Sequence, residues 1–352
     1  MKILLIDDLA LSGWKQVLEK AVTQIPIEIV ENIEKAREKL KKKYDLIFLD
    51  MRLGGADHKN ASHVEDFGGF KLLKEIKSDF RNANFPTPII LITASNKIWN
   101  IDKFKEYGAD FYYIKEHPNY VYSKEYSMEN LRQLQKNFER CIEINQNRNK
   151  IWILCNEIIS KIEKHSYFKS QDKRYVRVKE RIFDKIRLGY YYLFKRTTEI
   201  EEEKLLANNE SIAFVVFWSI LEEIVKGYTD INETWDGKYD RKPNWKFRNR
   251  KYFIEEGKNQ TYDDDKDYSE LVNLSSQVHG LLSCYISDEQ KQKEIREKFV
   301  EINKYRNQID YIHSSVRNIF TQKLIDPEQT KKCFGKNEEV LHFIISILEN
   351  CQ

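Results

Sequence analysis

Four short, mostly apolar runs in the first third of the chain each end at a polar residue. They are residues 2–6, 45–49, 88–92 and 111–114. Uninterrupted apolar runs of this length are typical of strands that are covered on both faces of a parallel sheet. Stretches with helical patterning lie between them, at residues 14–22, 33–41, 70–80 and 98–107. The alternation of strands and helices predicts an α/β domain built on a parallel sheet.

The polar residues that follow these runs are types that bind cations and phosphoryl groups. They are Asp7, Asp8, Asp50, Thr93 and Lys115. Ligands of such sheets bind at the carboxyl ends of the strands, so we expect the five side chains to converge there. Three converging carboxylates repel one another, and a hard divalent cation, usually Mg²⁺, relieves the repulsion. A phosphoryl group on Asp50 would then meet the hydroxyl of Thr93 and the charge of Lys115. Any one of these residues alone fits an ordinary loop, but the five in order predict a phosphoryl-accepting aspartate site.

Four motifs carry a resemblance to a known family across residues 1–125. They are Ile6-Asp7-Asp8, Leu49-Asp50-Met51-Arg52-Leu53, Thr93-Ala94, and Gly108-Ala109-Asp110 followed by Tyr112-Tyr113-Ile114-Lys115. With these motifs the segment resembles the receiver domain of two-component response regulators. The resemblance implies a flavodoxin-like, doubly wound (βα)5 fold and a sensor histidine kinase or a small phosphoryl donor as partner.

The same resemblance implies a role for each site residue. Asp50 is the expected phosphoacceptor. Asp8, Asp50 and the carbonyl of Arg52 are expected to hold Mg²⁺, with Asp7 helping through water. Tyr112 matches the aromatic switch position, whose rotamer follows the state of the site threonine.

Three features depart from the family pattern. Receivers usually carry proline four residues after the phosphoacceptor, where this chain has Gly54. They usually carry proline after the lysine, where this chain has Glu116. The loop over residues 54–67 is longer and more polar than usual, so we expect access to the site to differ.

Composition limits the rest of the chain. Its 352 residues suffice for two domains, and 59 basic against 56 acidic side chains leave a net charge of only +3. Any nucleic-acid surface must therefore be local. The five cysteines form no CxxC pair, which favours free thiols in a reducing compartment. No signal peptide precedes the first strand and no apolar run is long enough to span a bilayer, so we expect a cytoplasmic protein without a membrane partner.

Residues 126–174 are predicted to be a helical connecting segment. Apolar residues recur at helical spacing from 128 to 164, while the polar stretch 145–150 interrupts them. One long helix and two helices in series both fit this pattern. The segment could serve as a dimerisation element or simply pack on the next domain.

Residues 175–352 show no strand alternation and are predicted to form a helical bundle with an interrupting loop. The expected helices are 176–196, 199–208, 211–228, 268–285, 288–320 and 338–349. In the helix 288–320, one stripe about 100° wide holds six apolar residues together with Arg306 and His313. The apolar residues are Ile295, Phe299, Ile302, Ile309, Val316 and Phe320.

An arginine and a histidine within an apolar stripe need partners, because burying them unpaired costs several kcal/mol. In one interpretation Arg306 pairs with Glu222 or Glu223 and His313 is a satisfied core histidine. In the other, the stripe borders a cleft that binds a phosphodiester. Spacing alone favours the first interpretation.

The local sequence favours the second. Arg306-Asn307 is followed, six residues after Asn307, by His313, and the earlier segment 217–225 carries Glu222. With these features residues 175–352 resemble the HEPN family of helical ribonucleases and RNA-binding modules. The resemblance implies RNA cleavage without a cofactor: His313 would act as general acid or base, Arg306 would stabilise phosphoryl charge, and Asn307 and Glu222 would orient them. It also implies an active cleft between two protomers, hence a homodimer.

A basic, aromatic segment offers a candidate RNA contact. Residues 238–251 hold seven basic side chains against one acid, interleaved with aromatic residues. Basic groups bind phosphate and aromatic faces stack on unpaired bases. The candidates are Arg241, Lys242, Trp245, Lys246, Arg248 and Arg250. A solvated loop pinned by its aromatics fits equally well.

These features together predict an α/β plus all-α chain: a response-regulator-like protein whose Asp50 controls a HEPN-like ribonuclease, used as a toxin or in defence. The alternative is a non-catalytic signalling protein whose helical domain binds RNA or a protein, with Arg306 and His313 structural. A receiver that is never phosphorylated and serves only as a dimerisation platform is a third interpretation.

Overall fold

The computed structural model describes most of the chain in two units. It describes residues 1–22, 25–54, 63–94, 98–115, 124–165, 168, 173–194, 202–227, 229–233, 239–243, 278, 281–282, 285–308 and 327–351. Contacts between residues separate Met1–Trp152 from Ile153–Gln352, and each unit is described by itself. The division falls inside one continuous helix, α6 (Lys124–Lys164), well beyond residue 125 where the sequence motifs end.

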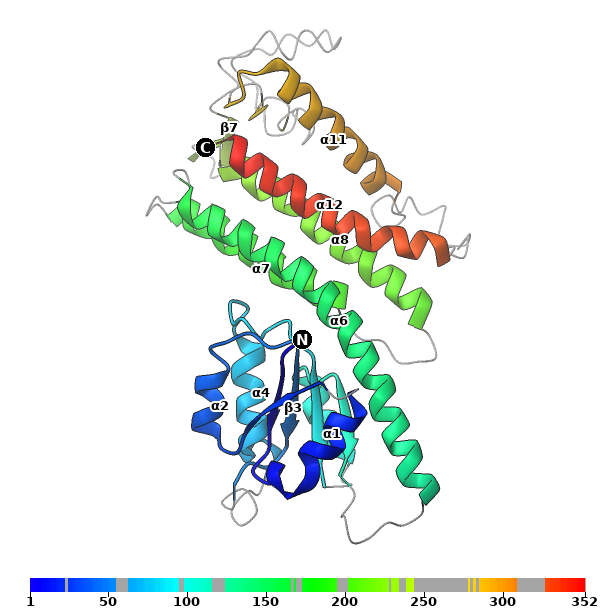
Figure 1. Cartoon of the computed structure of the whole chain (residues 1–352). Coiled ribbons are helices and arrows are strands. Elements are labelled where there is room, and N and C mark those ends of the chain that lie inside the picture. Colours follow the sequence, from blue (N-terminus) through cyan, green and yellow to red (C-terminus); the bar gives the residue numbers. More distant parts are fainter. Residues whose placement is uncertain are drawn as a thin grey trace. The chain divides into compact units, whose positions relative to one another are not determined.

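The first unit is built on a five-stranded parallel sheet (Figure 1). The strands are β1 (Ile3–Ile6), β2 (Ile27–Val30), β3 (Leu46–Asp50), β4 (Ile89–Thr93) and β5 (Phe111–Ile114). Their order, β2-β1-β3-β4-β5, is that of a flavodoxin-like doubly wound fold, so the predicted fold class is confirmed. The edge strand β2 was not among the predicted runs, because the exposed Glu28 interrupts its apolar residues.

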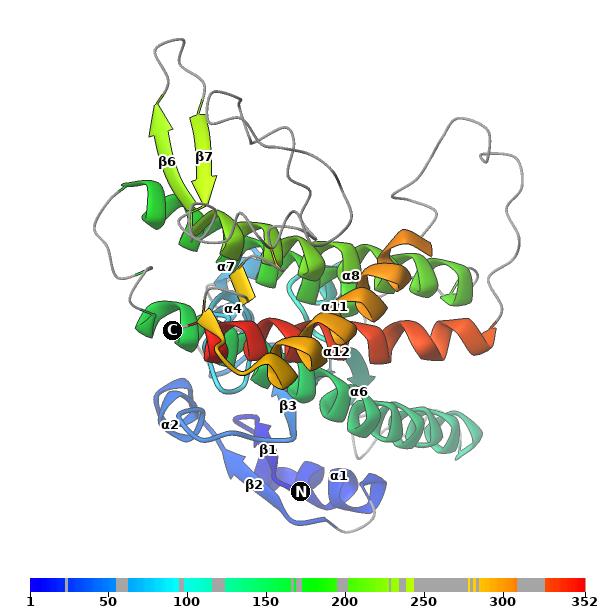
Figure 2. The same ribbon diagram turned by 90° about the horizontal axis from the view of Figure 1, so that it is seen from above.

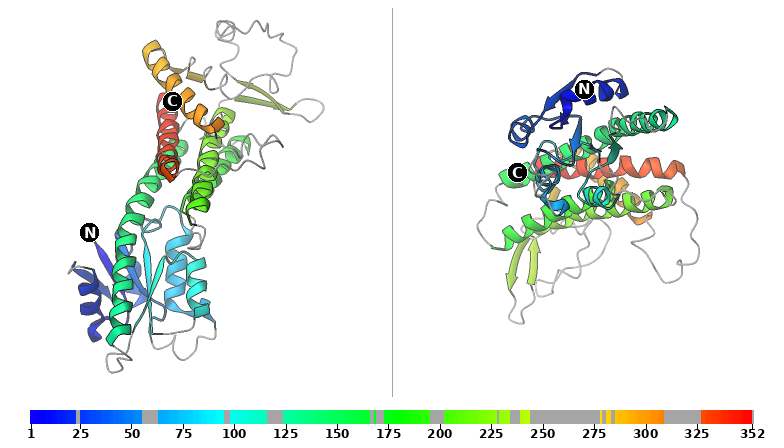
Figure 3. Two further views of the ribbon diagram at one scale, coloured as in Figure 1. Left: turned by 90° about the vertical axis from the view of Figure 1, so that its right-hand side faces the viewer. Right: turned by 90° about the horizontal axis from the view of Figure 1, so that it is seen from below.

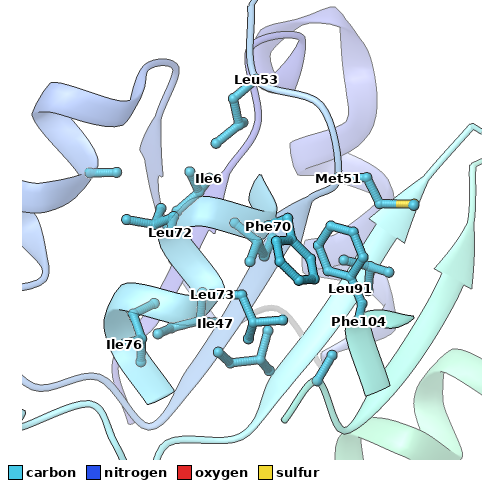
Figure 4. Close-up of a cluster of buried hydrophobic side chains, with 14 of the residues drawn as sticks. Ile6, Ile47, Met51, Leu53, Phe70, Leu72, Leu73, Ile76, Leu91 and Phe104 are labelled. Carbon is cyan, nitrogen blue, oxygen red and sulfur yellow. The ribbon is translucent and has the colours of Figure 1, made fainter. Parts of the chain in front are cut away.

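Helices cover both faces of this sheet. One face packs against α2 (Ile33–Lys39), α4 (Gly68–Ser78) and α5 (Ile98–Glu106). Figure 4 shows the centre of this core, where the rings of Phe70 and Phe104 meet edge to face with centroids 5.2 Å apart. Each such fully buried side chain contributes roughly 1.5–3 kcal/mol by leaving water.

The other face packs against α1 (Lys15–Ala21) and the first half of α6. Leu134, Phe138 and Cys141 of α6 are buried in the same cluster as sheet residues such as Phe48 and Ile92. Figure 3 shows α6 running along the sheet. The first half of this helix therefore completes the doubly wound fold, although the sequence pattern had placed it in a connecting segment.

The polar stretch 145–150 lies within α6 without breaking it, which decides for one long helix over two. Asn145 donates to the Asp45 carboxylate at 3.3 Å, and both terminal nitrogens of Arg148 reach the Asp110 carboxylate. These polar residues interrupt the apolar stripe because they bind acids of the first unit rather than water.

The second unit is helical, as predicted. Its long helices besides the end of α6 are α7 (Lys173–Phe194), α8 (Glu202–Gly227), α11 (Glu289–Gln308) and α12 (Pro327–Asn350). Helix α8 packs against both α7 and α12 (Figure 1). A Cβ at Gly189 of α7 would lie 2.4 Å from the Phe217 ring, so only glycine permits this close approach of α7 to α8.

Two expectations for this unit differ from the structure. The helices expected at 199–208 and 211–228 are one helix, α8, whose polar junction is held from outside: Asn337 donates to the backbone carbonyl of Glu210 at 3.1 Å. Part of the expected loop forms an antiparallel hairpin of β6 (Thr229–Glu233) and β7 (Tyr239–Pro243), which Figure 2 shows. Among the described helices, none is long and apolar enough to cross a membrane.

Candidate phosphoryl-acceptor and metal site

The parallel register brings the predicted polar residues to one edge of the sheet. Asp7 directly follows β1, Asp50 and Thr93 are the last residues of β3 and β4, and Lys115 directly follows β5. Thr93 pairs in register with Ile114, the residue before Lys115. All four positions therefore lie at the carboxyl edge, where the sequence pattern placed them.

Three carboxylates meet at this edge. One carboxylate oxygen from each of Asp7, Asp8 and Asp50 lies within 4.8 Å of the others. Asp7 is fully buried and Asp50 is only 8% exposed. Backbone amides fix two of the carboxylates: Leu9 N–H donates to Asp7 at 2.9 Å, and Gly54 N–H donates to Asp8 at 2.9 Å.

The ammonium of Lys115 bridges two of these acids. Its Nζ lies 2.8 Å from Asp7 Oδ2 and 2.7 Å from Asp50 Oδ2, and the side chain is 5% exposed. The backbone holds the lysine in place, because its N–H donates to the Thr93 carbonyl at 2.7 Å. Asn130 of α6 donates to the neighbouring Ile114 carbonyl at 2.9 Å.

The site holds more negative than positive charge. The pKa of Asp50 is raised to about 7, mainly by burial; the charge of Lys115 lowers it, and the charges of Asp7 and Asp8 contribute to the rise. Among the described residues of the site, three carboxylates lie near one ammonium, which bridges only Asp7 and Asp50, so a divalent cation would relieve the remaining repulsion. Clustered carboxylate oxygens are the donors that Mg²⁺ prefers, so the residues present fit the predicted ion.

Two glycines shape the site in ways that the motifs did not indicate. A Cβ on Gly69 would lie 2.0 Å from the Asp50 carbonyl oxygen, so α4 begins against the end of β3 only because residue 69 is glycine. Gly54 has φ +95°, and its N–H binds Asp8. Proline could supply neither feature, since its ring fixes φ near −65° and it has no N–H. The departure at this position thus has a structural role.

The switch residues differ in exposure. Thr93 is buried, whereas Tyr112 is 40% exposed and its ring lies beneath the ammonium of Lys105, 4.9 Å from the centroid. In this structure Tyr112 is therefore a surface residue in contact with Lys105, whereas Thr93 lies in the interior.

In the second unit, aromatic contacts fix how α8 and α11 run past each other. Trp218 meets Phe299 with centroids 5.3 Å apart, and Phe214 meets Tyr305 at 4.8 Å, so the helices are antiparallel. Arg306, half-buried, follows Tyr305 and lies at the level of Phe214.

The acidic residues of α8 lie at different distances from that level. Glu222 comes eight residues after Phe214, about 12 Å further along the helix. Glu210 comes one turn before Phe214, toward Arg306, and burial raises the pKa of its carboxyl to about 7. Along the helix axis, Glu210 therefore lies nearer to the level of Arg306 than Glu222 does. In the sequence, the i, i+4, i+8 spacing of Glu210, Phe214 and Trp218 indicates that these three residues share one face of a helix.

Glu223 has cationic partners on α7. It is 3% exposed, and its carboxylate lies 2.9 Å from Lys185 Nζ and 3.1 Å from Arg181 Nε. Of the apolar stripe on α11, Ile295, Phe299 and Ile302 are buried as predicted.

The remaining candidates are only partly described. Asn307 lies in α11, and Arg241 and Lys242 lie in β7, with their side chains outside the description. His313, Trp245, Lys246, Arg248 and Arg250 lie outside the described residues.

Comparison with known proteins finds a match to one protein family. The sequence model of the response regulator receiver domain matches residues 3–121. No curated protein matches the chain.

Solved structures of receiver domains resemble part of the chain. The signal receiver domain of a DNA binding response regulator from Colwellia psychrerythraea is 24% identical, covering 38% of this chain and 98% of its own, with a TM-score of 0.27. A two-component response regulator from Clostridium difficile is 28% identical, covering 38% and 96%, with a TM-score of 0.26. A CheY-like receiver domain from Methanospirillum hungatei is 21% identical, covering 40% and 96%, with a TM-score of 0.28.

These scores are low, so the assignment depends on the family match and on the strand order described above. A receiver domain implies phosphoryl donation from a histidine kinase. Residues 3–121 of this chain are a response regulator receiver domain.

Proposed function

We propose that Asp50 accepts a phosphoryl group from a histidine kinase or a small phosphoryl donor, and that Asp7, Asp8 and Asp50 hold Mg²⁺. The observation that carries this proposal is the cluster of three carboxylates at the carboxyl edge of the sheet, two of which are bridged by Lys115. A bound Mg²⁺ would supply positive charge to the phosphoryl oxygens.

The chemistry follows from the Asp50 carboxylate. One of its oxygens attacks phosphorus and an O–P bond forms; with a phosphohistidine donor the P–N bond breaks and neutral imidazole leaves, keeping the proton on its other ring nitrogen, whereas with acetyl phosphate the P–O bond to the acetyl group breaks and acetate leaves. Only the ionised carboxylate is nucleophilic, and burial raises the pKa of Asp50, so the opposing charge of Lys115 favours the reactive form. After transfer, the Lys115 ammonium and the Thr93 hydroxyl can bind phosphoryl oxygens.

Acetyl phosphate labelling with Mg²⁺ tests this proposal. Wild-type protein should take up one phosphoryl group, seen by intact mass, and hydroxylamine should remove it because it is an acyl phosphate. Asp50→Asn should take up none, while Asp79→Asn, which changes an aspartate beyond the end of α4, should label normally. Equal labelling of wild type and Asp50→Asn would assign the acceptor elsewhere.

We further propose that the helical unit is a homodimeric, metal-independent endoribonuclease gated by Asp50. The Arg306–His313 spacing supports it, as does the burial of the apolar residues that precede Arg306 on α11. His313 would move the 2'-OH proton and Arg306 would stabilise charge on the phosphoryl oxygens. The competing function, binding RNA or a protein without cleavage, keeps Arg306 and His313 structural.

Cleavage of a mixed RNA pool in the presence of a chelator separates these two functions. Wild-type protein should yield 2',3'-cyclic phosphate ends, His313→Ala should yield none, and His342→Ala, which changes an exposed histidine of α12, should cleave like wild type. RNA bound but uncut by wild-type protein would support the binding function instead. The cleavage assay and a measurement of oligomeric state should be repeated after labelling with acetyl phosphate. The comparison would show whether phosphorylation of Asp50 raises or lowers cleavage.

A further inference from the structure

The chain makes a π-helical turn directly beyond the acid pair of β1. The turn spans Ala10–Trp14, and the Lys15 N–H donates to the Ala10 carbonyl five residues back. Such turns occur mostly as single insertions and often at functional sites, because the extra residue re-aims the side chains that follow. Here the turn ends at Trp14, which is also the N-cap residue of α1.

Trp14 contacts two residues at the end of β5. The Lys115 Nζ lies over its ring, 5.8 Å from the centroid. The ring of Tyr113 meets it at 72°, with centroids 6.5 Å apart. Residues two apart on a strand point to the same face, so one indole can touch both.

Lys115 has a mobile stem that must be held for its ammonium to act. A lysine carries about 2 kcal/mol of rotamer entropy, and its ammonium makes no fixed fork of hydrogen bonds as arginine does. In this structure the ammonium has Asp7 and Asp50 as anionic partners and the face of Trp14 as its aromatic partner. Tryptophan gives the strongest cation–π attraction of the aromatic side chains, and removal from water strengthens it.

We propose that Trp14 is a positioning residue for the phosphoryl site, with its indole face holding the Lys115 ammonium between Asp7 and Asp50. The proposal rests on the function proposed above, in which that ammonium serves a phosphoryl group on Asp50. It follows that Trp14 emission senses the position of the Lys115 charge.

Fluorescence tests the contact without any phosphorylation. Lys115→Met should change the emission of wild-type protein, and the same substitution in a Trp14→Phe background should change it much less. Lys43→Met is the matched control, since Lys43 lies 4.9 Å over the Trp152 ring at the other end of the sheet. Its effect should be equal in both backgrounds. If Lys115→Met has the same effect with and without Trp14, the contact is refuted.

Labelling kinetics test the positioning role. With acetyl phosphate and Mg²⁺, Trp14→Leu should lower the labelling rate constant at saturating donor about five- to tenfold, the effect of losing about 1 kcal/mol of cation–π attraction. Trp14→Phe should recover most of the rate, because it retains an aromatic face. Trp152→Leu should label like wild type.

Three outcomes separate the possibilities. Wild-type rates in Trp14→Leu overturn the positioning role while leaving the acceptor function intact. Equal losses in Trp14→Leu and Trp14→Phe also overturn it, because they indicate packing rather than charge. A wild-type protein that takes up no phosphoryl group overturns the acceptor function and the positioning role with it.

Discussion

The two ends of the parallel sheet both bury acids beside a cation, yet they use them differently. At the carboxyl edge, Asp7 and Asp50 share the ammonium of Lys115. At the amino edge, Asp110 is 2% exposed and pairs with Arg148 of α6. The two edges use similar residue types with similar burial. They differ in the other groups that each charged side chain contacts.

At the amino edge the charged side chains also form hydrogen bonds with backbone N–H and carbonyl groups. Asp110 accepts from the Ile89 N–H at 2.9 Å while Arg148 approaches both of its oxygens. The half-buried Lys77 donates to the carbonyls of Phe85 and Thr87 at 2.7 and 2.6 Å. These contacts hold the loops that lead into β4 and β5.

At the carboxyl edge, Asp7 and Asp8 also accept from backbone amides, but three carboxylates lie close together there and Lys115 bridges only Asp7 and Asp50. In the proposed function, the charges of Asp50 and Lys115 would bind a metal ion and a phosphoryl group while the amide hydrogen bonds to Asp7 and Asp8 stay in place. A buried ion pair is therefore weak evidence for function by itself, and its partners decide the interpretation.

The largest expected effect is at the amino edge. Asp110→Ala should lower the free energy of unfolding of the first unit by about 4 kcal/mol, because it leaves Arg148 without its carboxylate and Ile89 without its acceptor. Hydrogen exchange of β4 amides measures this unit separately from the helical unit. The folded protein should still be labelled at Asp50. A folded Asp110→Ala protein that cannot be labelled would show that the two edges are not independent.

Gly69→Ala should affect the carboxyl edge nearly as strongly. Its Cβ would lie 2.0 Å from the Asp50 carbonyl, so α4 or the end of β3 must shift, at a cost of about 3 kcal/mol. The shift should also slow labelling of Asp50. Gly54→Ala is the control: no atom lies within 4 Å of its Cβ, so it should cost only about 1 kcal/mol, from the positive φ. Equal losses in both variants would argue against the clash.

Removing the cation from each edge compares them directly. Lys115→Met and Arg148→Met should each cost about 3 kcal/mol, by leaving buried carboxylates uncompensated. Adding Mg²⁺ should stabilise Lys115→Met more than wild type, since the metal no longer competes with Lys115 for Asp7 and Asp50. Arg148→Met should gain no more than wild type. The measurement is the shift in β4 exchange with and without Mg²⁺, and an equal gain in both variants would remove the distinction between the edges.

The carboxyl edge was more predictable from the sequence than the amino edge, for a physical reason. Asp7, Asp50 and Lys115 adjoin continuous apolar strands, so a local pattern locates them and the parallel fold brings them together. Arg148 and Asn145 instead looked like a break in α6, because their acidic partners lie far away in sequence.

The sequence pattern also did not predict the residues that shape the site through contacts in the folded protein. Gly69 matters through a distance to the Asp50 carbonyl, and Trp14 through a π-helical turn that no hydrophobic period predicts. The level of Glu210 relative to Arg306 likewise depends on two aromatic contacts between α8 and α11, which no pattern within one helix reveals.

The smallest expected effect is a pH dependence at the amino edge. Burial lowers the pKa of Lys77 to about 7, with Arg148 lowering it and the charges of Asp110 and Cys141 opposing. In the unfolded chain the lysine titrates near its ordinary value, so between the two pKa values the unfolded state binds more protons. Stability should therefore rise with pH above 7, by about 2 kcal/mol up to pH 9.

The variant Lys77→Met separates the contribution of Lys77 to the pH dependence of stability from that of other groups that titrate in the same range. The variant loses two hydrogen bonds to carbonyls, so it should be less stable than wild type at pH 9, where the wild-type amine is neutral and keeps those bonds. At pH 7 the difference should shrink, because the wild-type protein then bears the cost of a buried charge. Denaturant midpoints of both proteins across this range give the two slopes. If stability changes with pH by the same slope in both proteins, Lys77 stays charged in the folded protein because Asp110 stabilises its ammonium. The amino edge would then hold a charged lysine beside a carboxylate, as the carboxyl edge does.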